Sequence, residues 1–156
     1  MKRPSHYSRS GSPRMVDISA KPETERSASA HAFVRLPPAV LRALPRNPKG
    51  NPLDIARTAG IMAAKKTAEL IPLCHPLPLS HADVDVRLVA TGVEIVAIAS
   101  ATARTGVEME ALTAAAVAAL TVYDMTKALD KGIEIGELYL LEKTGGKSGG
   151  FRRKKK

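Results

Sequence analysis

The pentapeptide Tyr123-Asp124-Met125-Thr126-Lys127 places a carboxylate and an ammonium group three residues apart. In a helix, side chains at i and i+3 share a face, so Asp124 and Lys127 can touch. An exposed pair of this kind contributes only about a few tenths of a kcal/mol. A desolvated pair can transfer protons near neutral pH. The pair follows a nearly uncharged stretch of Ala, Leu and Val, which favours a helix that projects the two groups into a cleft.

A second motif, Leu73-Cys74-His75, stands between Pro72 and Pro76. The two prolines hold this segment extended, and that stiffness would fix the imidazole of His75 for contact with a ligand. Neighbours in an extended segment point to opposite faces, so Cys74 and His75 are not expected to form a nucleophilic pair. The alternative interpretation is a structural loop with a buried thiol.

Glu108, Met109 and Glu110 open a long predicted helix. Acidic residues are favoured there by the helix dipole, which is one explanation for the two glutamates. The other is that Glu110 accepts hydrogen bonds from a purine- or pterin-like ring. Both interpretations stay open on the sequence alone.

The segment Lys143–Gly150 is rich in glycine and carries two lysines. It resembles a Walker A loop only superficially, because Leu141 occupies the place of the first required glycine. Exposed backbone N–H groups could still form a nest for phosphates. The alternative is a flexible tail.

Metal-binding patterns are absent from the sequence. The four histidines are not spaced as HxxxH or HExxH, and Cys74 is the one cysteine, so no protein metal site is predicted. A single cysteine also excludes an internal disulfide and fits the cytoplasm. The longest apolar stretch, 111–122, is too short to span a membrane.

These motifs need a scaffold of strands and helices. The sequence predicts, in chain order, a strand at 32–36, a short helix at 37–44, a long helix at 52–70, a hairpin of strands at 81–90 and 93–101, a long helix at 107–131 and a strand at 133–141. Hairpin strands without regular βαβα alternation favour an α+β fold, with an antiparallel sheet and helices on one face.

The net charge of +9 over 156 residues lies at the ends of the chain. The segment 15–142 carries about −2. Aromatic residues make up only 3%, so stacking platforms for single-stranded nucleic acid are nearly absent. Nucleic acid is therefore an unlikely partner, although a module that binds it through both basic ends remains one alternative. A nucleotide phosphohydrolase that uses the glycine-rich segment is another, and the failed Walker spacing argues against it.

Four strings of this sequence resemble the cyclic pyranopterin monophosphate synthase family, also known as molybdenum cofactor biosynthesis protein C. They are MVDISAK at 15–21, the segment 56–80 with LCHPL, the segment 105–131 with GVEMEALTA and YDM, and the final LLEKTGGKSGGF. The resemblance implies a ferredoxin-like α+β fold and a homohexamer, a trimer of dimers with active sites between subunits. The match covers the single catalytic domain expected at 15–151. Composition predicts a flexible basic leader at 1–14, which is rich in Ser, Arg and Pro and has no periodicity, and a basic tail at 152–156, which departs from the family pattern.

The resemblance also implies a reaction and its residues. The reaction is the conversion of (8S)-3',8-cyclo-7,8-dihydroguanosine 5'-triphosphate to cyclic pyranopterin monophosphate and pyrophosphate. No tightly bound cofactor is expected, although Mg²⁺ can accompany the substrate phosphates. The expected acid–base residues are Asp124 and Lys127. The expected substrate contacts are Leu73, Cys74, His75, Met109 and Glu110. Candidates to hold phosphates or shuttle protons are Arg26, Lys49, Lys65, Lys143 and Lys147. Arg104 stands where the family commonly has lysine.

Overall fold

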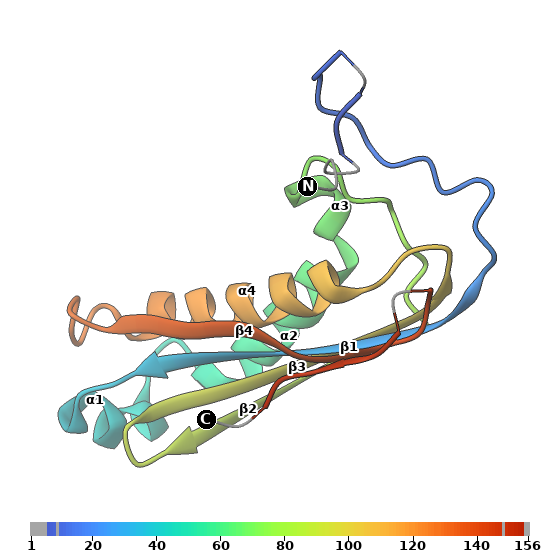
Figure 1. The fold of residues 1–156 in the computed structure, drawn as a ribbon. Helices are drawn as coiled ribbons and strands as arrows, with labels where there is room; N and C mark the ends of the chain where they lie inside the picture. The colour runs from blue at the N-terminus through green and yellow to red at the C-terminus, as the bar shows by residue number, and fades with distance from the viewer. Residues whose placement is uncertain (1–5, 9, 148, 155–156) are drawn as a thin grey trace.

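The structure is a computed structural model that describes residues 6–8, 10–147 and 149–154. Five strands form one antiparallel sheet in the order β2-β3-β1-β4-β5 (Figure 1). The strands are β1 Thr24–Arg35, β2 His81–Val89, β3 Gly92–Ala103, β4 Glu134–Thr144 and β5 Phe151–Arg152. The helices are α1 Pro38–Ala43, the 3₁₀ helix η1 Leu44–Arg46, α2 Pro52–Lys65, α3 Thr67–Leu70 and α4 Glu108–Thr126.

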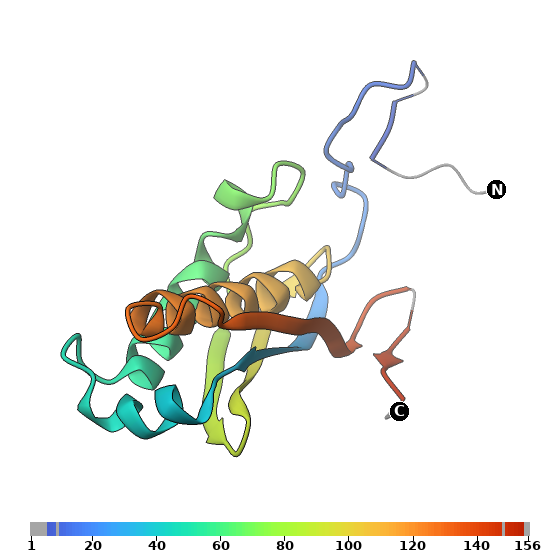
Figure 2. The same ribbon diagram turned by 90° about the vertical axis from the view of Figure 1, so that its left-hand side faces the viewer.

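The first four strands have the βαββαβ topology of a ferredoxin-like fold. The helices α1 to α3 lie between β1 and β2 in the chain, the β2–β3 hairpin follows, and α4 precedes β4. Helices α2 and α4 cover the same side of the sheet (Figure 2). This arrangement confirms the predicted α+β class, the antiparallel sheet and the packing of helices on one face.

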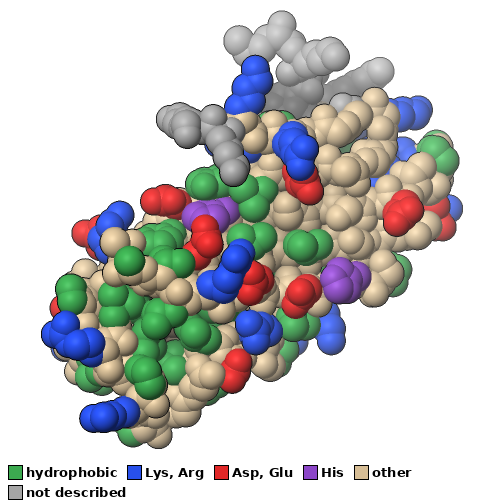
Figure 3. Space-filling model, turned by 90° about the horizontal axis from the view of Figure 1, so that it is seen from below, with side chains coloured by type: hydrophobic (Ala, Val, Ile, Leu, Met, Phe, Trp, Pro, Cys, Tyr) green, Lys and Arg blue, Asp and Glu red, His purple; other side chains and the backbone are tan. Residues whose placement is uncertain are grey.

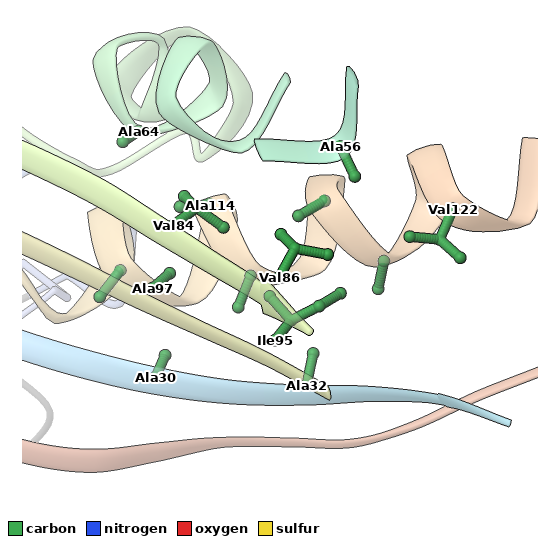
Figure 4. Packing of buried hydrophobic residues seen from close by; sticks show 14 of the residues in the cluster. Ala30, Ala32, Ala56, Ala64, Val84, Val86, Ile95, Ala97, Ala114 and Val122 are labelled. Atoms are coloured by element: carbon green, nitrogen blue, oxygen red, sulfur yellow. The ribbon is translucent and has the colours of Figure 1, made fainter. Parts of the chain in front are cut away.

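Small side chains fill the layer between the sheet and the two long helices (Figure 4). On β1, Ala28, Ala30, Ala32 and Val34 alternate toward the helices and are at most 1% exposed. The partners in α4 are mostly alanines, which are almost fully buried. Short side chains on both surfaces let the backbones approach closely, so this core holds no tryptophan and its largest fully buried side chain is Ile95.

Gly60 of α2 packs tightly against α4 and β2. A Cβ at this position would stand 2.9 Å from Ala114 O and 2.9 Å from Val84 Cγ2. We expect Gly60→Ala to lower the free energy of unfolding by about 1–3 kcal/mol, because the helices must separate to admit the methyl group. Thermal unfolding measures this. Gly136→Ala is the control, since a Cβ there has no neighbour within 4 Å, and equal melting temperatures of the two variants would contradict the expectation.

The prediction of one helix at 52–70 was wrong in one respect, because the helix breaks at Lys66 into α2 and α3. Lys66 has φ −108° and ψ 13°, outside the helical range. The buried hydroxyl of Thr67 donates to Ala63 O and Ala64 O at 3.2 and 3.0 Å, competing with the backbone bonds of the last turn. The break turns the following extended segment back toward α4.

The helix predicted at 107–131 is also shorter than expected, because α4 ends at Thr126. Leu129 N donates to Thr126 O in a tight turn, and Gly132 N donates to Asp130 Oδ1 at 2.7 Å. Lys127 therefore caps the helix rather than lying inside it. The strand predicted at 32–36 is longer than expected and begins at Thr24, because its small residues pair fully with β3.

The other face of the sheet carries charges of both signs, interspersed with hydrophobic side chains in the view from below (Figure 3). Arg87 on β2 contacts Asp85 at 2.7 Å and Glu94 of β3 at 4.0 Å, and Glu94 lies 3.6 Å from His31 of β1. At the edge, β5 pairs with β4, and Arg152 lies 3.3 Å from Glu142. Within the described residues, no helix has the length and apolar character needed to cross a membrane.

Candidate active site

A cavity of about 430 Å³ opens beside the N-terminal end of α4. The extended segment after α3 contributes Leu73, Cys74 and His75 to its wall, and α4 contributes Met109 and Glu110. These are the five residues expected to contact substrate. The structure brings all five together in this hollow, which we call the His75 cavity.

Glu110 is the buried acid of the His75 cavity. Its side chain is almost inaccessible, with the residue 4% exposed, and burial raises the pKa of its carboxyl group above the ordinary value. Burial, together with the nearby Glu110 charge, also raises the pKa of the Cys74 thiol. Cys74 is therefore a neutral thiol at neutral pH and no activated nucleophile. Glu110 can offer a protonated or an ionised carboxyl to the edge of a ring.

The imidazole of His75 is fixed by the main chain of the N-terminal segment. Its Nε2 lies 2.7 Å from the carbonyl oxygen of Val16. The segment that carries Val16 lies at the same end of the molecule as α3 and the start of α4 (Figure 1). Residues before β1 therefore belong to this site.

A second cavity, of about 640 Å³, contains a concentration of positive charge. Three predicted phosphate ligands line it, namely Arg26 of β1, Lys143 of β4 and Lys147 of the glycine-rich loop. Lys21 and Arg104 line it as well. We call it the Arg26 cavity, and five cations around one hollow suit a polyphosphate.

The two cavities adjoin, because Lys21, Thr105, Gly106 and Glu108 line both. At the boundary Lys143 Nζ donates to Glu108 Oε1 at 2.6 Å, and both side chains are only about a quarter exposed. A single ligand can therefore extend from one cavity into the other, with an anionic part among the cations and a polar ring beside Glu110.

Arg26 is held in place by its contact with the glycine-rich loop. Gly146 adopts a left-handed φ of 83°, and a Cβ there would collide with the guanidinium of Arg26. The same guanidinium donates from Nε to Ala103 O at 3.4 Å. Only glycine lets the loop fold against this side chain.

Asp124 and Lys127 lie at the opposite, C-terminal end of α4. Lys127 Nζ stands 2.6 Å from Asp124 Oδ1, and Lys49 Nζ stands 4.0 Å from Asp124 Oδ2. The hydrogen bond from Lys127 and the charges of both lysines lower the pKa of Asp124, and the same bond raises the pKa of Lys127. The side chains of Asp124 and Lys127 are 59% and 49% exposed, so the expectation of a desolvated pair in a cleft was wrong for this single chain.

The candidate residues thus fall into two groups rather than one. Glu110 and Asp124 are fourteen residues apart on one straight helix, which separates them by about 21 Å. Lys65 joins neither group. It is exposed at the end of α2 and lines neither cavity.

The charged residues Lys21, Arg104 and Glu108 also line the cavities, although the sequence interpretation did not assign them to the site. Each stands in or beside a string that carries the family resemblance, which is the signal that could have found them. Among the residues that the structure describes, no group of three or more His, Cys, Asp and Glu side chains could hold a metal ion.

Fold and cavities together define a ferredoxin-like α+β protein shaped to bind an anionic, ring-containing small molecule. The chain belongs to the MoaC family, whose model matches residues 15–146. Three relatives are each named cyclic pyranopterin monophosphate synthase. That of Thermomicrobium roseum is 57% identical over 152 residues, covering 95% of this chain and 92% of the relative. That of Deinococcus radiodurans is 56% identical over 144 residues, covering 91% of this chain and 86% of the relative. That of Parvibaculum lavamentivorans is 50% identical over 157 residues, covering 98% of each chain.

Proposed function

We propose that this chain is a lyase that forms cyclic pyranopterin monophosphate from (8S)-3',8-cyclo-7,8-dihydroguanosine 5'-triphosphate and releases pyrophosphate. The observation that carries the proposal is the junction of the His75 and Arg26 cavities. The substrate joins a guanine-derived ring system to a triphosphate. A polar pocket that opens directly into a cluster of five cations matches both parts.

The chemistry needs proton transfers and one phosphoryl displacement. Opening and re-closing the ring moves protons between ring nitrogens, carbons and oxygens, which positioned acids and bases accelerate. In the displacement, a sugar hydroxyl oxygen bonds to the α-phosphorus, the bond to the β-phosphate oxygen breaks, and the hydroxyl proton passes to a base. The cations of the Arg26 cavity would stabilise the charge on the leaving pyrophosphate. Mg²⁺ bound to the phosphates would assist there.

We place Asp124 and Lys127 in the site of a neighbouring subunit. At about 21 Å along α4 from Glu110, the pair lies too far away to share a small substrate with the His75 cavity of its own chain. Hydrophobic side chains near the pair support burial by another copy, since Leu120 and Leu129 are 57% and 52% exposed. A homohexamer built as a trimer of dimers in the cytoplasm would bring the two groups together.

The direct test is incubation with the cyclised nucleotide, followed by oxidation and fluorescence detection of a pterin. We expect pterin and pyrophosphate in equal amounts. A chain that released orthophosphate without pterin would be a phosphohydrolase, and nucleic-acid binding that required residues 152–156 without any turnover would favour the nucleic-acid module.

The contact between Gly146 and Arg26 predicts a binding defect. Gly146→Ala should displace the guanidinium and raise KM by about tenfold, with a smaller change in kcat, because a phosphate contact acts in both the ground and transition states. Gly149→Ala is the matched control. Gly149 also has a left-handed φ, of 70°, but a Cβ there has no neighbour within 4 Å. If both variants raised KM equally, backbone strain in the loop would be the cause, and the proposed contact of Arg26 with phosphate would be contradicted.

A further inference from the structure

The hydrogen bond between His75 and Val16 determines which nitrogen of the imidazole carries a proton. A carbonyl oxygen only accepts hydrogen bonds, so Nε2 of His75 must donate across the 2.7 Å contact. In a neutral imidazole the other nitrogen, Nδ1, is then unprotonated and can only accept. Among the described residues, Nδ1 of His75 has no hydrogen-bond partner. The half-buried ring therefore has one nitrogen that can accept a hydrogen bond from a ligand in the cavity that it lines.

We propose that the Val16 carbonyl is a positioning group that holds neutral His75 as the Nε2–H tautomer, so that Nδ1 accepts a hydrogen bond from a ring N–H of the substrate. The ligand class rests on the proposed function, since guanine- and pterin-type rings present N–H donors along their edges. The opposite tautomer would set the lone pair of Nε2 against the carbonyl oxygen of Val16, and an N–H at Nδ1 against the N–H of the substrate, so both hydrogen bonds would be lost.

The N-terminal segment is itself fixed, so the Val16 carbonyl is not a chance contact. Ser19 closes a local turn, with its hydroxyl donating to Asp17 Oδ1 at 2.6 Å and its N–H at 2.9 Å. Arg104 then fastens that turn to the rest of the chain. Its Nη1 donates to Ser19 O at 3.0 Å and its Nε lies 3.7 Å from Glu23 Oε1. Segment 16–23 is thus attached at His75 on one side and at Arg104 on the other.

The acid opposite His75 completes the recognition. Glu110 lines the same cavity and is buried. A ring edge that presents several N–H groups would meet two acceptors, Nδ1 of His75 and a carboxylate oxygen of Glu110. An edge that presents a carbonyl oxygen would face the lone pair on Nδ1, so the tautomer selects for donors.

Magic-angle-spinning NMR of the protein labelled with 15N-histidine tests the tautomer directly and without substrate. The chain has four histidines, and His75→Asn assigns the resonance that disappears. We expect an unprotonated Nδ1 and a protonated Nε2 for His75 in mildly alkaline buffer, where an imidazole is neutral. A protonated Nδ1 in the intact protein would overturn the proposal. Since no turnover is needed, this result is independent of whether the proposed reaction occurs.

Two truncations test the positioning role of Val16. A chain that starts at Met15 keeps the carbonyl, while a chain that starts at Ser19 loses it but keeps all of β1. We expect the first to retain the tautomer and a kcat/KM within about threefold of the full chain. The second should show a mixture of tautomers and a kcat/KM lower by about tenfold or more. An unchanged tautomer in the second truncation would contradict the proposal.

Two substitutions separate the roles of the two nitrogens. The amide of His75→Gln reaches the place of Nε2 and can still donate to Val16, but it supplies nothing at Nδ1. The carbonyl of His75→Asn reaches the place of Nδ1 and can still accept from substrate. We expect kcat/KM to fall further for His75→Gln than for His75→Asn, with both variants folded by circular dichroism. The reverse order would assign the substrate contact to Nε2 and refute the proposal.

Discussion

We expect the replacement of Asp124 by asparagine to lower kcat by about a hundredfold or more while substrate binding survives. The amide keeps the size of the carboxylate and can still contact Lys127, but it cannot accept a proton. The proposed phosphate ligands of the Arg26 cavity lie at the other end of α4, so the substitution should leave them intact. Steady-state kinetics and equilibrium binding of the substrate measure the two effects separately. Glu69→Gln, at an exposed position that lines neither cavity, is the control and should retain full kcat.

The pH dependence of kcat for the unsubstituted chain tests the same assignment. Lys127 and Lys49 lower the pKa of Asp124, so the carboxylate stays ionised as the pH falls through the ordinary carboxylate range. The loss of kcat through protonation of Asp124 should therefore begin only below that range, and Lys127→Met should move it to higher pH. Normal turnover of Asp124→Asn, or a defect confined to substrate binding, would make the pair an ordinary surface ion pair.

Mixing two inactive variants restores activity if each site takes residues from two chains. Asp124→Asn lacks the proposed proton acceptor, and Lys143→Ala lacks a proposed phosphate ligand. At substrate concentrations well below the KM of the unsubstituted chain, each homo-oligomer should therefore show little activity, the first through a low kcat and the second through a high KM. In co-assembled oligomers with random mixing, about a quarter of the composite sites would carry Asp124 from one chain and Lys143 from another. Co-expression with two affinity tags, followed by sequential purification, yields the mixed species for assay.

The outcome distinguishes a shared site from a site within one chain. If Asp124 acted together with Lys143 of its own chain, every site in the mixture would keep one defect and activity would not return. A mixture of Asp124→Asn with Lys127→Met is the control. Both defects then lie on the same side of the interface and no combination of chains repairs them. Recovery in this control would contradict the composite site.

The sequence by itself determined the local structure and the chemical inventory. The alternation in β2 and β3 predicted the hairpin, and Asn51 caps α2 as its position before a proline suggested, accepting from Leu53 N at 3.0 Å. The extended segment with His75 and the helix start with Glu110 were found as motifs because short-range spacing dictates both. The ion pair of Asp124 and Lys127 followed from their separation of three residues.

Only the tertiary structure decided how far apart these motifs lie and how much water reaches them. The family resemblance assigned both Asp124 and Glu110 to the active site, but within one chain helix α4 separates them by about 21 Å. Burial raises the pKa of Glu110. Asp124 is exposed, and its pKa is lowered mainly by the hydrogen bond from Lys127 and by the charges of Lys127 and Lys49. The contact of Val16 with His75 joins residues 59 positions apart. No local pattern encodes such a contact, because it depends on where the tertiary fold places the segment before β1 and the segment after α3.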